Sequence, residues 1–105
     1  MVELNFSTPE EIVQRICDRL RVERVAQAMT QGELAARAGV SKSTISNVES
    51  GHSVKLEYIV RVAMALGRSS ELENLFLPSL GSIDDVNRYE ATANRQRVRN
   101  KGSRA

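Results

Sequence analysis

Apolar residues recur at every third or fourth position along most of this chain, and no stretch alternates apolar and polar residues as a half-buried strand would. The first segment opens with Thr8-Pro9-Glu10-Glu11, which places an N-cap threonine before a helical proline and a glutamate three residues after the cap. Ile12, Ile16 and Leu20 then follow at helical spacing. This pattern predicts a helix from about residue 9 to residue 27.

The stretch from Thr30 to Gly51 predicts two short helices joined by a tight turn. Thr30 and Glu33 repeat the capping pattern, and the helix that they begin ends at Gly39, a residue suited to the left-handed conformation of a helix C-cap. Ser41 can cap the helix that follows. The apolar residues that should face inward in this pair are Leu34, Ala35, Ala38, Ile45 and Val48, with Val40 in the turn.

Two further helices are expected before the pattern breaks. A broad apolar face predicts a helix over residues 55–66, capped by Gly67, and a shorter helix should follow over residues 70–76. A proline, a glycine and several serines then mark the edge of the compact domain near residue 80. The residues of the shorter helix that should turn inward are Leu72, Leu75 and Phe76.

The sequence therefore predicts an all-α protein, a compact five-helix bundle followed by a basic extension. The expected division is an N-terminal arm over residues 1–8, the bundle over residues 9–80 and the extension over residues 81–105. Residues 1–85 carry nine Lys and Arg against twelve Asp and Glu, whereas residues 86–105 carry six against one. Ser82 can begin a marginal helix that frays into disorder, with one face formed by Val86, Tyr89 and Ala93.

The composition argues against several kinds of function. One cysteine and one histidine cannot form a disulfide framework or a Cys/His zinc site within one chain, and the six glycines are not clustered as a phosphate-binding loop requires. We therefore expect no enzyme, no metal and no cofactor, and we interpret Cys17 as a buried structural thiol. The N-terminus does not resemble a signal peptide, and no apolar stretch reaches the ~20 residues that span a bilayer. These features predict a soluble, cytoplasmic protein with no membrane partner.

The two short helices meet at a glycine turn, and the second has small polar residues on its outer side. This is the layout of a helix-turn-helix, which places its second helix in the major groove of DNA. Spacing alone leaves open another helical protein with an exposed polar helix. On DNA, Lys42 can donate to guanine or a phosphate, and Asn47 can pair with adenine. The hydroxyls of Ser43 and Thr44 can take either role. The expected contacts to the DNA backbone are Thr30, Gln31, Ser41 and Ser46.

The segment TQGELAARAGVSKSTISNVESG, followed by LEYIVRVAMALG, resembles the lambda-Cro and phage-repressor class of helix-turn-helix proteins, the XRE-type family, over about residues 12–77. The resemblance implies a lambda-repressor-like DNA-binding domain in which Gln31 clamps the DNA backbone. It also implies a largely buried ion pair between Arg24 and Glu49. The positions that read bases in the family correspond to Lys42, Ser43 and Asn47.

The chain departs from the family in the loop after Gly51, which usually carries basic or small polar residues and a proline, whereas this chain has His52-Ser53-Val54-Lys55. We interpret His52 as simply exposed, with a phosphate contact as the alternative. The resemblance further implies a homodimer that represses transcription. This dimer would bind double-stranded DNA at a palindromic operator whose half-sites lie ~34 Å apart. The candidate residues for the dimer interface are Leu72, Leu75, Phe76 and Leu77.

The basic extension loosely resembles the tails of small regulators that accompany Hip-type kinase toxins. We therefore expect the autoregulating antitoxin of a toxin–antitoxin operon, with such a kinase as partner. The alternatives are a stand-alone prophage or restriction–modification regulator and a mainly protein-binding module that restrains a toxin. The extension itself can be a solvated segment, an arm on DNA or a partner-binding peptide, and its candidate contacts are Arg95, Arg97 and Arg99.

Overall fold

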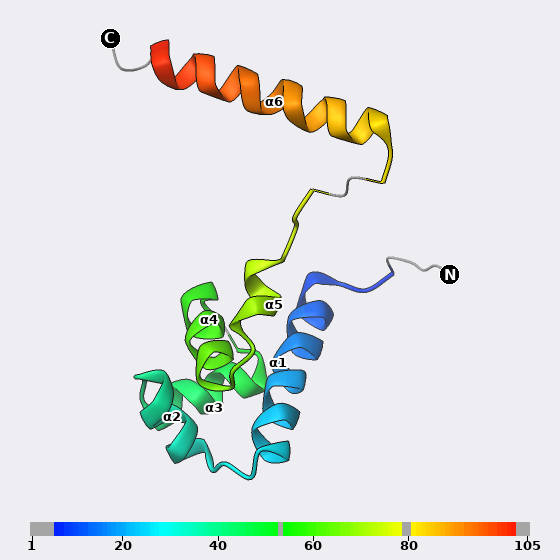
Figure 1. Cartoon of the computed structure of the whole chain (residues 1–105). Coiled ribbons are helices and arrows are strands. Elements are labelled where there is room, and N and C mark those ends of the chain that lie inside the picture. The colour runs from blue at the N-terminus through cyan, green and yellow to red at the C-terminus, as the bar shows by residue number, and fades with distance from the viewer. Residues whose placement is uncertain (1–5, 53, 79–80, 103–105) are drawn as a thin grey trace. The chain divides into compact units, whose positions relative to one another are not determined.

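The computed structural model describes residues 6–52, 54–78 and 81–102 (Figure 1). Its helices are α1 (Pro9–Ala26), α2 (Gln31–Ala38), α3 (Lys42–Ser50), α4 (Leu56–Ala65), α5 (Ser69–Glu73) and α6 (Ile83–Gly102). No strand occurs in these described ranges, so the predicted all-α class is confirmed. Contacts divide the chain into two units, one of residues 1–73 with α1 to α5 and one of residues 74–105 with α6.

Side-chain caps begin the first three helices at the residues that the sequence predicts. The hydroxyl of Thr8 accepts a hydrogen bond from the backbone N–H of Glu11, and the Glu11 carboxylate accepts one from the N–H of Thr8, which completes a capping box. An equivalent box begins α2, and the Ser41 hydroxyl caps α3. Each cap supplies partners for backbone N–H groups that the first turn of a helix leaves unpaired.

Left-handed residues end several helices of the first unit. Gly39 after α2 has φ 71°, a conformation that is costly for residues with a side chain. A Cβ atom at this position would lie 3.4 Å from a guanidinium nitrogen of Arg61 in α4, an ordinary contact distance, so it is the left-handed turn that favours glycine here. Gly67 takes the same conformation one residue after Leu66, the C-cap residue of α4. The end of α1 is different, because Ala28 occupies the left-handed position there with φ 58°.

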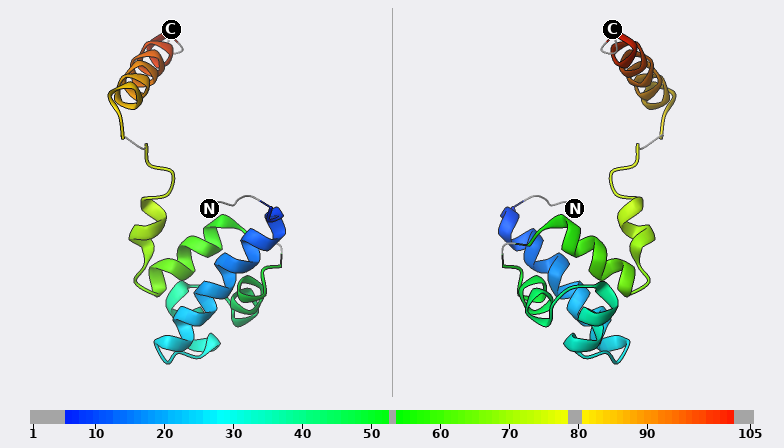
Figure 2. Two further views of the ribbon diagram at one scale, coloured as in Figure 1. Left: turned by 90° about the vertical axis from the view of Figure 1, so that its right-hand side faces the viewer. Right: turned by 90° about the vertical axis from the view of Figure 1, so that its left-hand side faces the viewer.

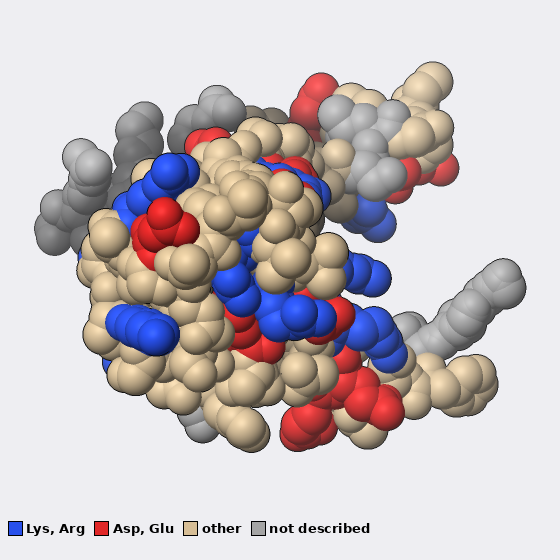
Figure 3. Space-filling model, turned by 90° about the horizontal axis from the view of Figure 1, so that it is seen from below, with Lys and Arg blue, Asp and Glu red and all other residues tan. Residues whose placement is uncertain are grey.

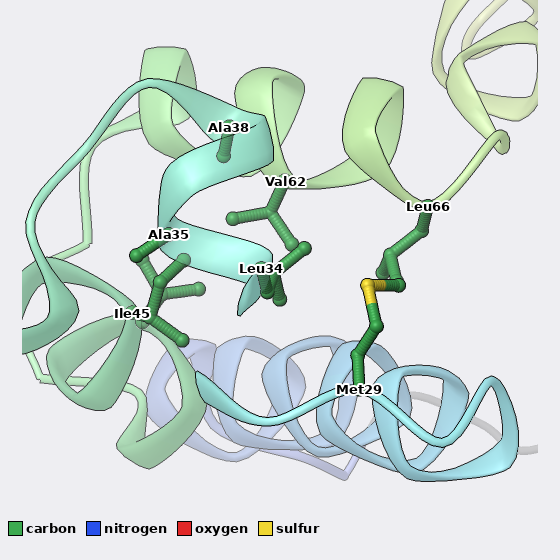
Figure 4. Close-up of a cluster of buried hydrophobic side chains, with 8 residues drawn as sticks. Met29, Leu34, Ala35, Ala38, Ile45, Val62 and Leu66 are labelled. Atoms are coloured by element: carbon green, nitrogen blue, oxygen red, sulfur yellow. The ribbon is translucent and has the colours of Figure 1, made fainter. Parts of the chain in front are cut away.

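The core of the first unit lies between α2, α3 and α4. Figure 4 shows Leu34 of α2 and Val62 of α4 pointing toward each other, while Met29, in the turn before α2, meets Leu66 after α4. α2 packs against both α3 and α4, and α1 packs against α3. The three views agree that α1 and α3 lie side by side (Figures 1 and 2). The predicted inward residues of the two short helices are all buried: Leu34, Ala35, Ala38, Ile45 and Val48.

The apolar spacing of α1 does not produce a buried stripe. Ile12 and Ile16 are 44% and 43% exposed, and the α1 side chain that is buried is that of Cys17. The expectation of an inert, buried thiol therefore matches the position of Cys17, and burial raises the pKa of its thiol.

The segment after α4 differs from its prediction. α5 ends at Glu73, not at Phe76, and Phe76 adopts a left-handed φ of 60° that ends any helical continuation. Leu72 is half-buried, but Leu75 and Phe76 are 51% and 96% exposed, so the prediction that these two turn inward is wrong.

α6 is longer than the marginal helix that the sequence predicts. The Ser82 hydroxyl accepts a hydrogen bond from the N–H of Asp85 and caps the first turn, where two aspartates face the positive end of the helix dipole. Val86 and Tyr89 are half-buried, whereas Ala93 is exposed. The helix continues to Gly102, so the expected fraying is not found within the described residues.

Candidate functional site

The outer surface of α3 is polar and carries almost no charge. Ile45 and Val48 are buried, at 0% and 1% exposure, and they hold α3 on the core. The one acidic residue of α3, Glu49, also faces inward. The side chains of α3 that are exposed on the opposite surface belong to Lys42, Ser43, Ser46, Asn47 and Ser50, a set that we call the α3 outer face.

The structure separates the predicted contacts of α3 into two groups. Lys42, Ser43 and Asn47 lie on the α3 outer face, as the predicted base contacts must. Thr44 does not, because it is half-buried and its hydroxyl lies 2.9 Å from that of Ser41. Thr44 is thus less exposed than the other predicted base contacts.

Ser41 is occupied as the N-cap of α3. Its Oγ accepts a hydrogen bond from the backbone N–H of Thr44 at 3.1 Å and lies 3.3 Å from the hydroxyl of Ser43. This network fixes the start of α3 and leaves the Lys42 side chain exposed at its first turn.

The N-terminus of α2 is capped from within the chain. The Thr30 hydroxyl accepts from the N–H of Glu33 at 3.0 Å, and the Glu33 carboxylate accepts from the N–H of Thr30 at 2.8 Å. These hydrogen bonds, chiefly the one from the Thr30 backbone, lower the pKa of Glu33. Gln31 is half-buried, and its side-chain amide donates to Glu49 at 3.1 Å. The two predicted backbone contacts thus lie together at this helix end, but Gln31 is already held by α3.

Arg24 and Glu49 form the best-buried ion pair among the described residues. Arg24 Nε lies 2.6 Å from Glu49 Oε2, and their side chains are 12% and 4% exposed. A second guanidinium nitrogen donates to Glu49 Oε1 at 3.1 Å, and a third donates to the carbonyl oxygen of Met29 at 2.7 Å. The hydrogen bonds to Glu49 raise the pKa of Arg24. This network joins α1, the turn before α2, and α3, so it fixes the orientation of α3.

Sequence reasoning missed one residue at the far end of α3. Ser50 continues the surface formed by Ser43 and Ser46, and helical spacing alone would have identified it. Its Oγ donates to the carbonyl oxygen of Asn47 at 3.0 Å and lies 3.0 Å from Nδ1 of His52, which is exposed. No spacing rule identifies this second contact, because it depends on how the chain turns at Gly51.

Among the described residues of the first unit, four of the nine basic side chains pair with acidic ones, and Arg24 and Arg68 are two of them. Within the described residues, Arg21 pairs with Asp18 and Arg61 with Glu57, while the Lys42 and Lys55 side chains have no acidic partner. The ammonium of Lys55 lies 5.8 Å from the centre of the Tyr58 ring. Figure 3 shows basic and acidic side chains interspersed on the face seen from below, rather than one continuous basic area.

The other predicted sites lie in the second unit or at its border. Leu75, Phe76 and Leu77 are exposed, and Leu72 of α5 is half-buried. Arg95 is exposed on α6, with a 3.5 Å hydrogen bond to the hydroxyl of Thr92. The side chains of two further predicted contacts, Arg97 and Arg99, lie outside the described residues.

The described part of the chain holds neither a candidate metal site nor a membrane-spanning helix. Over the described part of the chain, no three His, Cys, Asp or Glu side chains come together in a way that could hold a metal ion. The helices found there include none that is long and apolar enough to cross a membrane.

One comparison with known proteins bears on these observations. A family model described as helix-turn-helix matches residues 20–72, from the second half of α1 into α5. The matched region contains the Arg24–Glu49 pair, both helices of the glycine turn and the whole α3 outer face.

Proposed function

Because the chain belongs to the helix-turn-helix family and is a DNA-binding transcription regulator, we propose that it is a repressor that reads its operator with the α3 outer face. The observation that carries the proposal is that this face presents lysine, asparagine and serines with no exposed carboxylate. Short polar side chains permit close approach to the major groove, and a carboxylate there would be repelled by DNA phosphates.

The exposed residues have distinct roles in this proposal. Lys42 donates to guanine or to a phosphate, Asn47 pairs with adenine through two hydrogen bonds, and the Ser43 hydroxyl takes either role. Backbone contacts come from Ser46 and from the N-terminus of α2, where Thr30 and Gln31 lie. Ser41 contributes to the site by capping α3. The Arg24–Glu49 pair acts on DNA only indirectly, because it holds α3 in place.

The test begins with a duplex selected by the full chain from a random-sequence library. We expect Asn47→Ala to weaken binding to this duplex by ~1–3 kcal/mol while binding to an unselected duplex of equal length changes little. Asn87→Ala is the matched control, since Asn87 is an exposed asparagine of α6. Equal losses on both duplexes would contradict the base-reading role of Asn47, and failure to select any sequence would contradict the proposal itself.

We further propose that the protein binds as a homodimer on a palindrome, because one helix of this kind reads few base pairs. The support for an interface after α5 is the exposure of Leu75, Phe76 and Leu77, at 51%, 96% and 61%, next to the half-buried Leu72. Phe76→Ser should shift sedimentation from dimer to monomer and leave the helix content unchanged. A variant that remains dimeric at equal concentration would remove Phe76 from the interface.

As biological context we propose an autoregulating antitoxin, with a Hip-type kinase toxin as partner. The support is that α6 lies outside the matched region and that residues 86–105 carry an excess of basic side chains, which the first unit lacks. A stand-alone regulator predicts that no protein accompanies the chain when it is purified gently from its host. The antitoxin is supported if a stoichiometric kinase-like protein accompanies the chain and is lost when residues 95–105 are deleted. If the same deletion instead reduces the salt dependence of DNA binding, the extension is a DNA arm.

A further inference from the structure

His52 is held at the edge of the α3 outer face. Its backbone N–H donates to the carbonyl oxygen of Asn47 at 3.2 Å, and its ring Nδ1 lies 3.0 Å from Ser50 Oγ. The turn that carries it lies beside α1, because a Cβ atom at Gly51 would lie 2.8 Å from the amide oxygen of Gln14. The ring is exposed, and His52 is the one histidine of the chain.

The hydrogen bonds of Ser50 decide which ring nitrogen carries a proton. A serine hydroxyl has a single hydrogen, and Ser50 donates it to the carbonyl oxygen of Asn47 at 3.0 Å. With its hydrogen on Asn47, Ser50 Oγ accepts toward His52, which favours the tautomer that carries its proton on Nδ1. In the neutral ring Nε2 then carries a lone pair, and it gains a hydrogen only when the whole ring becomes positively charged.

We propose that His52 binds a DNA phosphate through Nε2 and that the protein takes up a proton at this ring when it binds DNA. This inference rests on the DNA-binding function proposed above. A phosphate oxygen accepts hydrogen bonds but cannot donate them, so the neutral ring would present one lone pair to another. The charged ring presents an N–H donor and a positive charge, which together form a strong contact.

The charged groups around this turn do not substitute for the histidine. Glu49, the acidic residue of α3, is turned inward to Arg24. Lys55, the N-cap of α4, lies over the Tyr58 ring. On α1, the side chains that line a shallow hollow with Gln14 are Glu11, Arg15, Asp18 and Arg19. Histidine is the side chain whose charge ordinarily changes between about pH 6 and pH 8.

The direction of the pH effect follows from the proton uptake. The phosphate stabilises the charged ring, so the contact is present at low pH and is lost as the pH rises. We expect the affinity of the full chain for its library-selected duplex to fall about tenfold per protomer between about pH 6 and pH 8 at constant ionic strength, which corresponds to ~1.4 kcal/mol. DNA phosphates carry the same charge throughout this range, so the change must come from the protein.

Three variants test the assignment. His52→Gln should bind weakly at both pH values, with little dependence on pH, while His52→Lys should bind at both with the affinity that the natural chain has at low pH. Ser50→Ala keeps the histidine but removes the acceptor that holds the Nδ1 proton, so it should show a smaller pH dependence than the natural chain. Circular dichroism at both pH values checks that every variant retains its helix content.

The outcomes separate this inference from the function on which it rests. If the natural chain and His52→Gln lose affinity equally between the two pH values, or if affinity rises with pH, the phosphate contact is refuted. A full pH dependence in Ser50→Ala would refute the proton assignment. If the natural chain binds the library-selected duplex no better than an unselected one at either pH, then the proposed function fails.

Discussion

Replacement of Glu49 by alanine tests whether the buried ion pair holds the first unit together. In the native protein the Glu49 carboxylate accepts two hydrogen bonds from Arg24, at 2.6 and 3.1 Å, and one from Gln31 at 3.1 Å. Its side chain is 4% exposed and that of Arg24 is 12% exposed. Glu49→Ala would therefore leave a guanidinium largely out of water with its acidic partner gone.

The magnitude follows from the burial of the pair. Removal of one partner of a buried ion pair costs about 3–5 kcal/mol, because the other charge stays desolvated. We expect a loss near the lower figure, about 3 kcal/mol, since Arg24 keeps its hydrogen bond to the Met29 carbonyl and retains slight access to water. Domains of this size are stable by about 5–15 kcal/mol, so the variant should remain folded but with a large fraction of its stability lost.

Urea unfolding measures the effect if the first unit is observed separately from α6. A Tyr89→Phe background leaves Tyr58, which is half-buried in the first unit, as the single tyrosine to be followed by fluorescence. The control replaces both partners with apolar residues, Arg24→Met with Glu49→Leu. Because neither charge is then buried, this double variant should recover most of the loss, to within about 1–2 kcal/mol of the native protein.

A loss below about 1 kcal/mol in Glu49→Ala would refute this reasoning, because it would give the pair the value of an exposed salt bridge. A double variant no more stable than Glu49→Ala would show instead that the hydrogen bonds to Met29 and Gln31, rather than the unpaired charge, dominate the network.

Two further predictions concern stability. Ala28→Gly should stabilise the first unit by about 0.5–1 kcal/mol, because the relief of left-handed strain at φ 58° exceeds the chain entropy that glycine costs. The control Ala36→Gly in α2 should destabilise it by about 1 kcal/mol. Equal effects of the two substitutions in urea titrations would contradict the assignment of strain. In the folded state, hydrogen bonds from the N-cap backbone of α2 and from Arg68 lower the pKa values of Glu33 and Glu71. The contribution of these two carboxylates to the free energy of unfolding is therefore complete above about pH 5 and is lost as the pH falls below about 4.3. A variant with glutamine at both positions should lose less stability in acid than the native protein. An acid unfolding profile identical to that of the native protein would refute this origin.

The local parts of this structure follow directly from the sequence. Thr8, Thr30 and Ser41 begin helices because a side-chain oxygen within three residues satisfies the first free N–H groups, and Gly39 ends one because it tolerates a positive φ. Each of these effects acts over a few residues, so no distant contact is needed to predict it. The outward position of Lys42 and Asn47 on α3 follows from the same helical spacing once Ile45 and Val48 are assigned to the core.

What the sequence by itself determined, then, is where the helices from α1 to α4 begin and end, to within about a residue, and which residues share a helix face. Only the tertiary structure decided which faces are covered, as Ile16 and Phe76 demonstrate by remaining exposed despite favourable spacing or an apolar side chain. Helical spacing could not place Arg24 against Glu49, 25 residues later, a pair that the family resemblance implied and that the structure contains. Only the structure placed Ser50 against the ring of His52. Periodicity describes one helix at a time, whereas burial and ion pairing depend on the distances between helices.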